Sequence, residues 1–213
     1  MKLSLDMPTG LFFEPWPDEQ RRAHLRETLA AAPDPDAIWV FGYGSLIWDP
    51  RFEPAETRRA VLAGHRRSFC FWVTLGRGSP ERPGLGLAVV PCDGSVTGVA
   101  FRIPRDETFE DVLEALWTRE MLGGVYHARW LPLATEEGDV QAIVYVANDG
   151  HRNYCGDLSL DDRAWIMAGA EGPRGFNYEY LGQLVSELDR LGIEDEEHRA
   201  LYARILEIVR ASE

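Results

Sequence analysis

Six apolar segments rich in β-branched and aromatic residues, most of them joined by short turns, constrain the fold of this chain. They read IWVF, RSFCFWVT, LGLAVVP, VTGVAFRI, VYHARWLPL and VQAIVYVAN, and they lie between residues 38 and 148. Strands joined by short turns pair antiparallel, because a parallel pair needs a long crossover. The pattern therefore predicts an antiparallel or mixed sheet that curls towards a barrel, and it argues against a doubly wound fold.

Helical patterns flank these segments. A polar helix is expected at about residues 17–32, and three more follow from about residue 159, in SLDDRAWIMAGA, FNYEYLGQLVSELDRLG and DEEHRALYARILEIVRA. The sequence thus predicts an α+β fold, with a mixed, mostly antiparallel, barrel-like sheet and flanking helices. We divide the chain into an N-terminal extension with one helix, residues 1–37, and a single domain, residues 38–213.

The charge balance excludes some partners. A net charge of -13 repels nucleic-acid phosphates and anionic lipids. The N-terminal stretch MKLSLDMPTGLFFEPWPDEQ has one Lys, a short apolar run and early acids, which fits neither a signal peptide nor a spanning helix. We therefore expect no nucleic-acid partner, no membrane and a cytoplasmic location.

The sequence also lacks metal and cofactor motifs. Its five histidines form no HExxH or HxH pair, and its three cysteines form no CxxC pair. Gly42-x-Gly44 lacks the third glycine of a dinucleotide fingerprint, and no GxxxxGK loop occurs. We expect neither a metal nor a cofactor, and the odd number of cysteines suits a reducing compartment.

The segment FGYGSLIWDP, residues 41–50, leaves the strand IWVF through two glycines that flank Tyr43. Glycine allows a tight turn and a close approach of the backbone to another group. That group is a ligand in one interpretation. In the other, Tyr43 and Trp48 are core residues and the turn only packs against the rest of the fold. Because Gly44 directly precedes Ser45, the G-x-S-x-G nucleophile pattern does not fit. Ser45 is instead expected to offer a hydroxyl or a backbone N–H, in a turn able to bind a small anion.

The helix expected in TFEDVLEALWTREML places an acid on its apolar face. At 100° per residue, Glu120 falls within the apolar stripe, whereas Arg119 is expected to point towards solvent. A carboxylate on an apolar stripe is costly unless it is paired or useful. Glu120 is therefore either half of a structural ion pair, with Arg129 or Arg67, or a general base whose pKa is raised by desolvation.

The aromatic segment RGFNYEYL has two readings as well. It fits simple helix packing, and it also carries Asn177 and Tyr180 on an otherwise apolar face. A small-molecule pocket needs a few such convergent polar groups.

Several motifs together resemble the ChaC-type γ-glutamylcyclotransferases of bacteria, in that family's order and over about residues 38–195. They are YGSLIW, GHRRSFC, ERPGLGLAV, GVAFRI, LWTREMLGGVY, GDLSL and GPRGFNYEYL. The resemblance implies that Glu120 is the catalytic glutamate. It also implies a γ-glutamyl pocket walled by the turn at Tyr43, Gly44, Ser45 and Leu46, with Tyr126 and Tyr180 as further hydrogen-bond donors.

The implied reaction is the cleavage of glutathione into 5-oxoproline and cysteinylglycine, without water or cofactor. The expected partner is thus a small-molecule substrate, glutathione or a γ-glutamyl peptide. Two alternatives stay open: the same cyclisation of another γ-glutamyl amine or peptide, and a non-catalytic γ-glutamyl-binding regulator.

Overall fold

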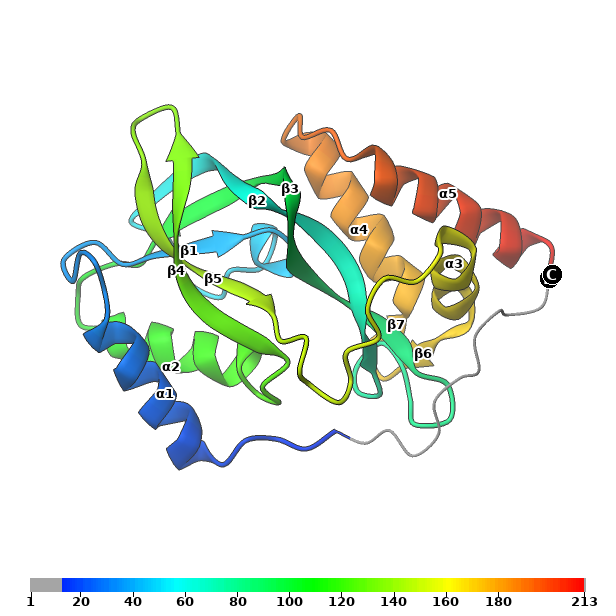
Figure 1. Cartoon of the computed structure of the whole chain (residues 1–213), viewed down its shortest axis with the longest axis horizontal. Helices are drawn as coiled ribbons and strands as arrows, with labels where there is room; N and C mark the ends of the chain where they lie inside the picture. Colours follow the sequence, from blue (N-terminus) through cyan, green and yellow to red (C-terminus); the bar gives the residue numbers. More distant parts are fainter. Residues whose placement is uncertain (1–12, 213) are drawn as a thin grey trace. The chain divides into compact units, whose positions relative to one another are not determined.

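Five strands close into a barrel in the computed structural model, which describes residues 13–212 (Figure 1). The neighbours follow the order β1-β3-β2-β4-β5, and β3 also pairs with β5. The β1–β3, β2–β4 and β4–β5 pairs are antiparallel, whereas β5 runs parallel to β1 and β3. The predicted α+β fold with a mixed, barrel-like sheet is confirmed. The strands are β1 (Trp39–Gly42), β2 (Glu56–Val73), β3 (Gly84–Arg102), β4 (Tyr126–Thr135) and β5 (Val140–Ala147).

The chain divides into two units, which are described separately. The barrel unit comprises Glu14–Ser68 and Ala88–His151. The helical unit contains Phe69–Leu87 and the chain from Arg152 onward. Because β2 and β3 are long, each runs from one unit into the other. Residues 1–12 of the predicted N-terminal extension lie outside the described residues.

Two strands are longer than the sequence predicted. LGLAVVP and VTGVAFRI belong to one continuous strand, β3, and β2 already begins at Glu56. The prediction of two separate strands was wrong because the sequence PCDGS between them is typical of a turn. In the structure it is an exposed to half-exposed stretch of β3. On β2, Gly64 adopts a positive φ of 73° opposite the carbonyl of Cys92, so the strand bends at this level without ending.

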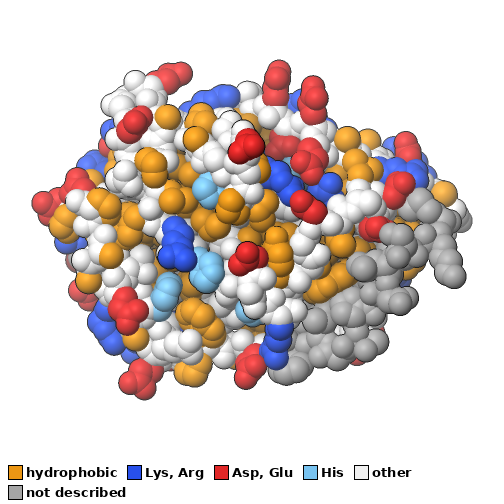
Figure 2. All heavy atoms as spheres, in the orientation of Figure 1, with side chains coloured by type: hydrophobic (Ala, Val, Ile, Leu, Met, Phe, Trp, Pro, Cys, Tyr) orange, Lys and Arg blue, Asp and Glu red, His pale blue; other side chains and the backbone are white. Residues whose placement is uncertain are grey.

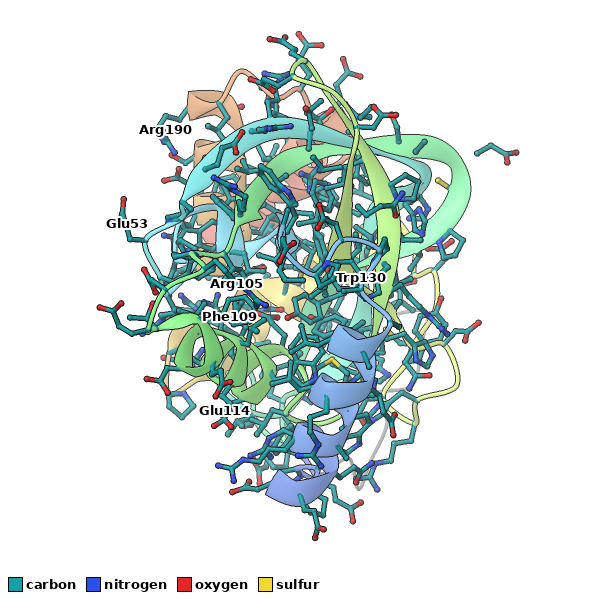
Figure 3. All side chains as sticks on the ribbon, turned by 90° about the vertical axis from the view of Figure 1, so that its left-hand side faces the viewer. Glu53, Arg105, Phe109, Glu114, Trp130 and Arg190 are labelled. Carbon is teal, nitrogen blue, oxygen red and sulfur yellow. The ribbon has the colours of Figure 1, made fainter. Side chains whose placement is uncertain are left out.

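Apolar residues of the strands and of α2 (Phe109–Glu120) form the core of the barrel unit. Strand β1 is buried along its whole length, and α2 buries Leu113, Leu116 and Trp117. These positions follow the period of 3.6 expected of a helix with one buried face. Glu110 and Asp111 in the first turn of α2 are exposed. Figure 3 shows Arg105 beside Phe109 there, with the guanidinium 4.0 Å from the ring centre.

Helix α1 (Asp18–Ala30) confirms the polar helix predicted near the N-terminus. It lies beside α2 (Figure 1), where the indole N–H of Trp117 donates to Nδ1 of His24 at 3.1 Å. The indole N–H of Trp130, labelled in Figure 3, donates to the carbonyl of Thr28 at 2.8 Å. Since α1 has only one fully buried side chain, Leu25, these hydrogen bonds add to a small apolar contact.

The helical unit confirms the three predicted C-terminal helices. They are α3 (Leu160–Gly169), α4 (Asn177–Arg190) and α5 (Glu196–Arg210), with the two-stranded sheet of β6 (Glu171–Gly172) and β7 (Gly175–Phe176) between α3 and α4. Leu181, Leu184 and Leu188 of α4 are buried at the spacing of one helix face.

Charged side chains lie among hydrophobic and other side chains on the visible face in Figure 2. Figure 2 shows Asp and Glu side chains scattered over the visible face rather than gathered into one patch. Within residues 13–212, no helix is both long and apolar enough to cross a membrane.

Candidate active site

The turn after β1 is shaped by a glycine that is needed for packing. A Cβ on Gly42 would lie 2.8 Å from Cε2 of Phe101, so no larger residue fits without displacing that ring. After Gly44 the chain forms a single 3-10 turn, Ser45–Ile47, closed by the N–H of Ile47 on the carbonyl of Gly44 at 2.9 Å. The first N–H groups of such a turn have no partner within it.

The side chain of Tyr43 belongs to the core of the barrel unit. It is 7% exposed, and its hydroxyl donates to the carbonyl of Tyr145 at 2.5 Å. The carbonyl of Tyr43 accepts a hydrogen bond from Nε of Arg67 at 2.7 Å. The core reading of Tyr43 is thus correct for its ring. Any ligand contact of this residue would come from its main chain.

Arg119 connects this turn to the end of α2. Its guanidinium donates to Oγ of Ser45 at 2.7 Å and to the carbonyl of Asp49. The expectation that Arg119 points towards solvent was wrong: its side chain is only 25% exposed. The periodicity argument places the Cβ on the outer side of the helix, but the long side chain folds back onto the turn.

Glu120 lies on the inner side of the last turn of α2, as its position in the apolar stripe predicted. Its side chain is 15% exposed, and Nε of Arg119 lies 3.0 Å from its Oε1. The predicted partners, Arg67 and Arg129, were wrong, because the cation beside Glu120 is its neighbour in sequence. This ion pair lacks hydrogen-bond geometry, so the buried Oε1 has no hydrogen-bond partner among the described residues.

The surroundings of Glu120 favour its neutral form. Burial raises the pKa of this carboxyl above its ordinary value, and the positive charge of Arg119 offsets part of the effect. A carboxylate with a raised pKa and an acceptor oxygen that receives no hydrogen bond is suited to take a proton from a bound amine.

The loop after α2 is held in place by backbone contacts. Gly124 has a positive φ of 71°, and its carbonyl accepts a hydrogen bond from the side-chain amide of Asn148 at 2.9 Å. The carbonyl of Leu122 accepts a hydrogen bond from the backbone N–H of Trp16 at 2.7 Å. The indole of Trp16 lies where a Cβ of Gly124 would be. The segment before α1 therefore packs on the loop that follows Glu120.

Tyr145 lies beside these residues, although the sequence analysis treated it only as part of a strand. It is 1% exposed, its ring lies edge-on to that of Trp117 with 5.9 Å between centres, and its hydroxyl has no hydrogen-bond partner in the described part of the chain. A tyrosine within the buried run AIVYVA of this strand is the signal that could have revealed it, since a buried phenol requires a partner.

The other predicted site residues fall in both units. The ring of Tyr126, in the barrel unit, lies 6.2 Å from that of Tyr145. Asn177 and Tyr180 belong to the helical unit, where the amide of Asn177 bonds both backbone groups of Leu85 and Tyr180 lies edge-on to Phe69. The structure thus brings together Glu120, Tyr126 and the turn of Tyr43, Gly44, Ser45 and Leu46. Among residues 13–212 there is no group of three or more His, Cys, Asp or Glu side chains placed to hold a metal.

The fold and this constellation define a barrel protein with a largely buried carboxylate at a helix end, which Arg119 links to the turn after β1. The family model described as ChaC-like protein matches residues 38–211, so the chain belongs to the ChaC-like protein family. The predicted resemblance to ChaC-type proteins is thereby confirmed.

Named relatives agree with this membership. The chain is 43% identical over 182 residues to the glutathione-specific gamma-glutamylcyclotransferase of Escherichia coli K12, covering 85% of this chain and 78% of that protein. It is 33% identical over 171 residues to glutathione-specific gamma-glutamylcyclotransferase 1 of Danio rerio, covering 78% and 86%. The crystal structure of a glutathione-specific γ-glutamyl cyclotransferase from yeast matches with a TM-score of 0.73 at 25% identity, covering 80% of this chain and 96% of the yeast chain.

Proposed function

We propose that this protein is a glutathione-specific γ-glutamylcyclotransferase, an enzyme that needs no cofactor. It cleaves glutathione into 5-oxoproline and cysteinylglycine. Relatives that carry this name match most of the chain. The observation that carries the proposal is the carboxylate of Glu120, which is buried, has a raised pKa and keeps an acceptor oxygen without a hydrogen-bond partner among the described residues.

The reaction begins at the α-amino group of the γ-glutamyl unit. Glu120 accepts a proton from the neutral amine as its nitrogen attacks the γ-carbonyl carbon of the same molecule. A C–N bond forms and closes the five-membered lactam, while the amide bond to the cysteinyl nitrogen breaks. The carboxyl of Glu120 then returns the proton to the departing amine, so no water is consumed.

The remaining task of the site is to fold the substrate so that amine and carbonyl meet. An intramolecular attack gains much of its rate from orientation alone. Main-chain N–H groups of Gly44, Ser45 and Leu46 serve as contacts for the substrate carboxylate and the developing oxyanion. Tyr126, Asn177 and Tyr180 remain candidates for pocket hydrogen bonds, and Tyr43 contributes the turn itself.

The working location of the enzyme is proposed from its thiols. Cys70, Cys92 and Cys155 form no disulfide in the structure, which fits the reducing cytoplasm where glutathione is held as a thiol. Neither nucleic acid nor a membrane is part of the proposed function.

The test is release of 5-oxoproline from reduced glutathione, measured beside other γ-glutamyl peptides and amines for wild type and Glu120→Gln. We expect wild type to act on glutathione, and the variant to lose roughly 10² to 10⁴ in rate, the usual range for a positioned base. Preference for another γ-glutamyl compound would keep the reaction and change the substrate. If wild type turned over none of them, the binding-regulator alternative would replace the enzyme.

A further inference from the structure

The hydroxyl of Tyr145 is a second buried polar group of the barrel unit that the mechanism above does not use. The residue is 1% exposed, and this hydroxyl has no hydrogen-bond partner in the part of the chain that the structure describes. Buried polar groups in folded proteins are nearly always paired, since an unpaired one costs free energy. A hydroxyl kept in this state is explained if a molecule bound in the site supplies its partner.

Three neighbouring segments surround Tyr145 and all belong to the proposed site. Its carbonyl accepts the hydroxyl hydrogen of Tyr43 at 2.5 Å, which joins β5 to the turn after β1. Its ring lies edge-on to Trp117, which is three residues before Glu120 on α2 and on the same face of that helix. The ring of Tyr126 lies on β4, with its centre 6.2 Å away.

The surroundings of the hydroxyl favour its protonated form. Burial raises the pKa of Tyr145 well above its ordinary value, and the negative charge of Glu120 raises it further. The phenol therefore stays protonated and acts as a hydrogen-bond donor. Among the described residues, the hydroxyl of Tyr145 is thus a donor without a hydrogen-bond partner. Oε1 of Glu120 is an acceptor that contacts Arg119 as an ion pair but receives no hydrogen bond.

This pair of one donor and one acceptor matches the two groups of the substrate that react in the cyclisation. The substrate presents an amine, which must give up a proton, and a carbonyl oxygen, which gains negative charge as the amine attacks. The two groups approach each other during the reaction, so an acceptor and a donor in one place serve both at once. A preorganised donor aimed at the developing oxyanion lowers the barrier more than it strengthens substrate binding.

We propose that Tyr145 is a second catalytic residue, whose hydroxyl donates a hydrogen bond to the γ-carbonyl oxygen of the substrate while Glu120 takes the proton from its α-amine. This role rests on the proposed function. Tyr145 gains and loses no atoms in the reaction. Its hydrogen bond complements those from the N–H groups of the turn at Gly44, Ser45 and Leu46.

The test is Tyr145→Phe, which removes the hydroxyl and keeps the ring. Since the hydroxyl has no protein partner in the described structure, the melting temperature should stay the same or rise. We expect kcat for 5-oxoproline release to fall roughly 10²- to 10³-fold, as for other oxyanion donors, with a much smaller change in KM. The acid limb of the pH profile, which reports Glu120, should persist.

Tyr43→Phe is the matched stability control. It also removes one tyrosine hydroxyl, but this hydroxyl donates to the carbonyl of Tyr145, so the melting temperature should fall. Comparison of the two variants separates a hydroxyl that supports the fold from one that is reserved for a ligand.

The outcomes distinguish this role from the proposed function. If wild type cleaves glutathione and Tyr145→Phe keeps kcat within a few-fold, the role of Tyr145 is overturned and the proposed function stands. The same holds if Tyr145→Phe loses activity together with melting temperature, because the hydroxyl is then structural. If wild type cleaves no γ-glutamyl compound, both proposals are overturned.

Discussion

Arg119 donates a hydrogen bond from its guanidinium to Oγ of Ser45 at 2.7 Å, although 74 positions separate the two residues in the chain. The same guanidinium donates to the carbonyl of Asp49 and lies 3.0 Å from a carboxylate oxygen of Glu120. A planar guanidinium can hold several acceptors in fixed directions, which an ammonium group does not do. The side chain of Arg119 thus fixes the position of the turn relative to the proposed base.

Removal of this cation should change the pH profile of the enzyme. Arg119 lowers the pKa of Glu120, so in Arg119→Gln that pKa should rise further above its ordinary value. Because the base must be ionised, activity is lost as pH falls through its pKa, and the acid limb should move to higher pH. The looser turn should also cost roughly 10- to 100-fold in kcat/KM for 5-oxoproline release.

Arg22→Gln is the control for the loss of an arginine near α2. Its side chain is 62% exposed and lies 3.5 Å from Glu114, so it should leave the profile unchanged. An unshifted acid limb in Arg119→Gln would contradict the assignment of that limb to Glu120.

Glu120→Gln should make the protein at least as stable as wild type near neutral pH. The carboxyl has a raised pKa in the folded state, so the native protein binds more protons than the unfolded chain between the two pKa values. Wild-type stability should therefore decline as pH rises through this interval, and the neutral amide escapes that decline. Melting temperatures of both proteins, measured from about pH 4 to pH 8, should diverge with rising pH. A lower melting temperature for the variant at every pH would instead identify Glu120 as half of a structural ion pair.

The residues that sequence reasoning placed correctly depend on local rules. Helical periodicity over Phe109–Glu120 is sufficient to put Glu120 on the buried face of α2. The extended pattern of IWVF and the glycines after it likewise locate the end of β1 and its turn. Both depend on neighbours within a few positions of the chain.

The residues that it missed depend on tertiary contacts. Arg119 was misplaced because its partners, Ser45 and Asp49, are 74 and 70 positions away. Tyr145 was overlooked because only the folded barrel shows that its hydroxyl is unpaired. The length of β3 was underestimated because turn-prone residues remain in a strand when the barrel supplies its neighbours.

Asn177→Ala should destabilise the protein. The amide of Asn177 is 1% exposed, accepts from the N–H of Leu85 at 2.8 Å and donates to its carbonyl at 3.1 Å. Truncation leaves both backbone groups unpaired, at about 1–3 kcal/mol each. Denaturant unfolding should show this loss, and Asn148→Ala, which removes one half-buried bond to Gly124, should lose less. Unchanged stability with a raised KM would mean that Asn177 acts mainly on the substrate.

Gly124→Ala tests the contact between the segment before α1 and the loop after Glu120. Gly124 has a φ of 71°, and a Cβ there would lie 2.5 Å from Nε1 of Trp16. Gly138→Ala is the matched control, because Gly138 also has a positive φ but nothing lies within 4 Å of its Cβ position. Both variants should pay about 1–3 kcal/mol for backbone strain, and only Gly124→Ala must also displace Trp16.

The displaced indole should affect activity as well as stability. Trp16 bonds the carbonyl of Leu122, two residues after Glu120, so a shift of this segment moves the helix end that carries the base. We expect Gly124→Ala to lower kcat for 5-oxoproline release by about tenfold or more, whereas Gly138→Ala keeps the wild-type value. Equal kcat in the two variants would mean that residues preceding α1 do not position Glu120, and that their packing on the loop serves stability alone.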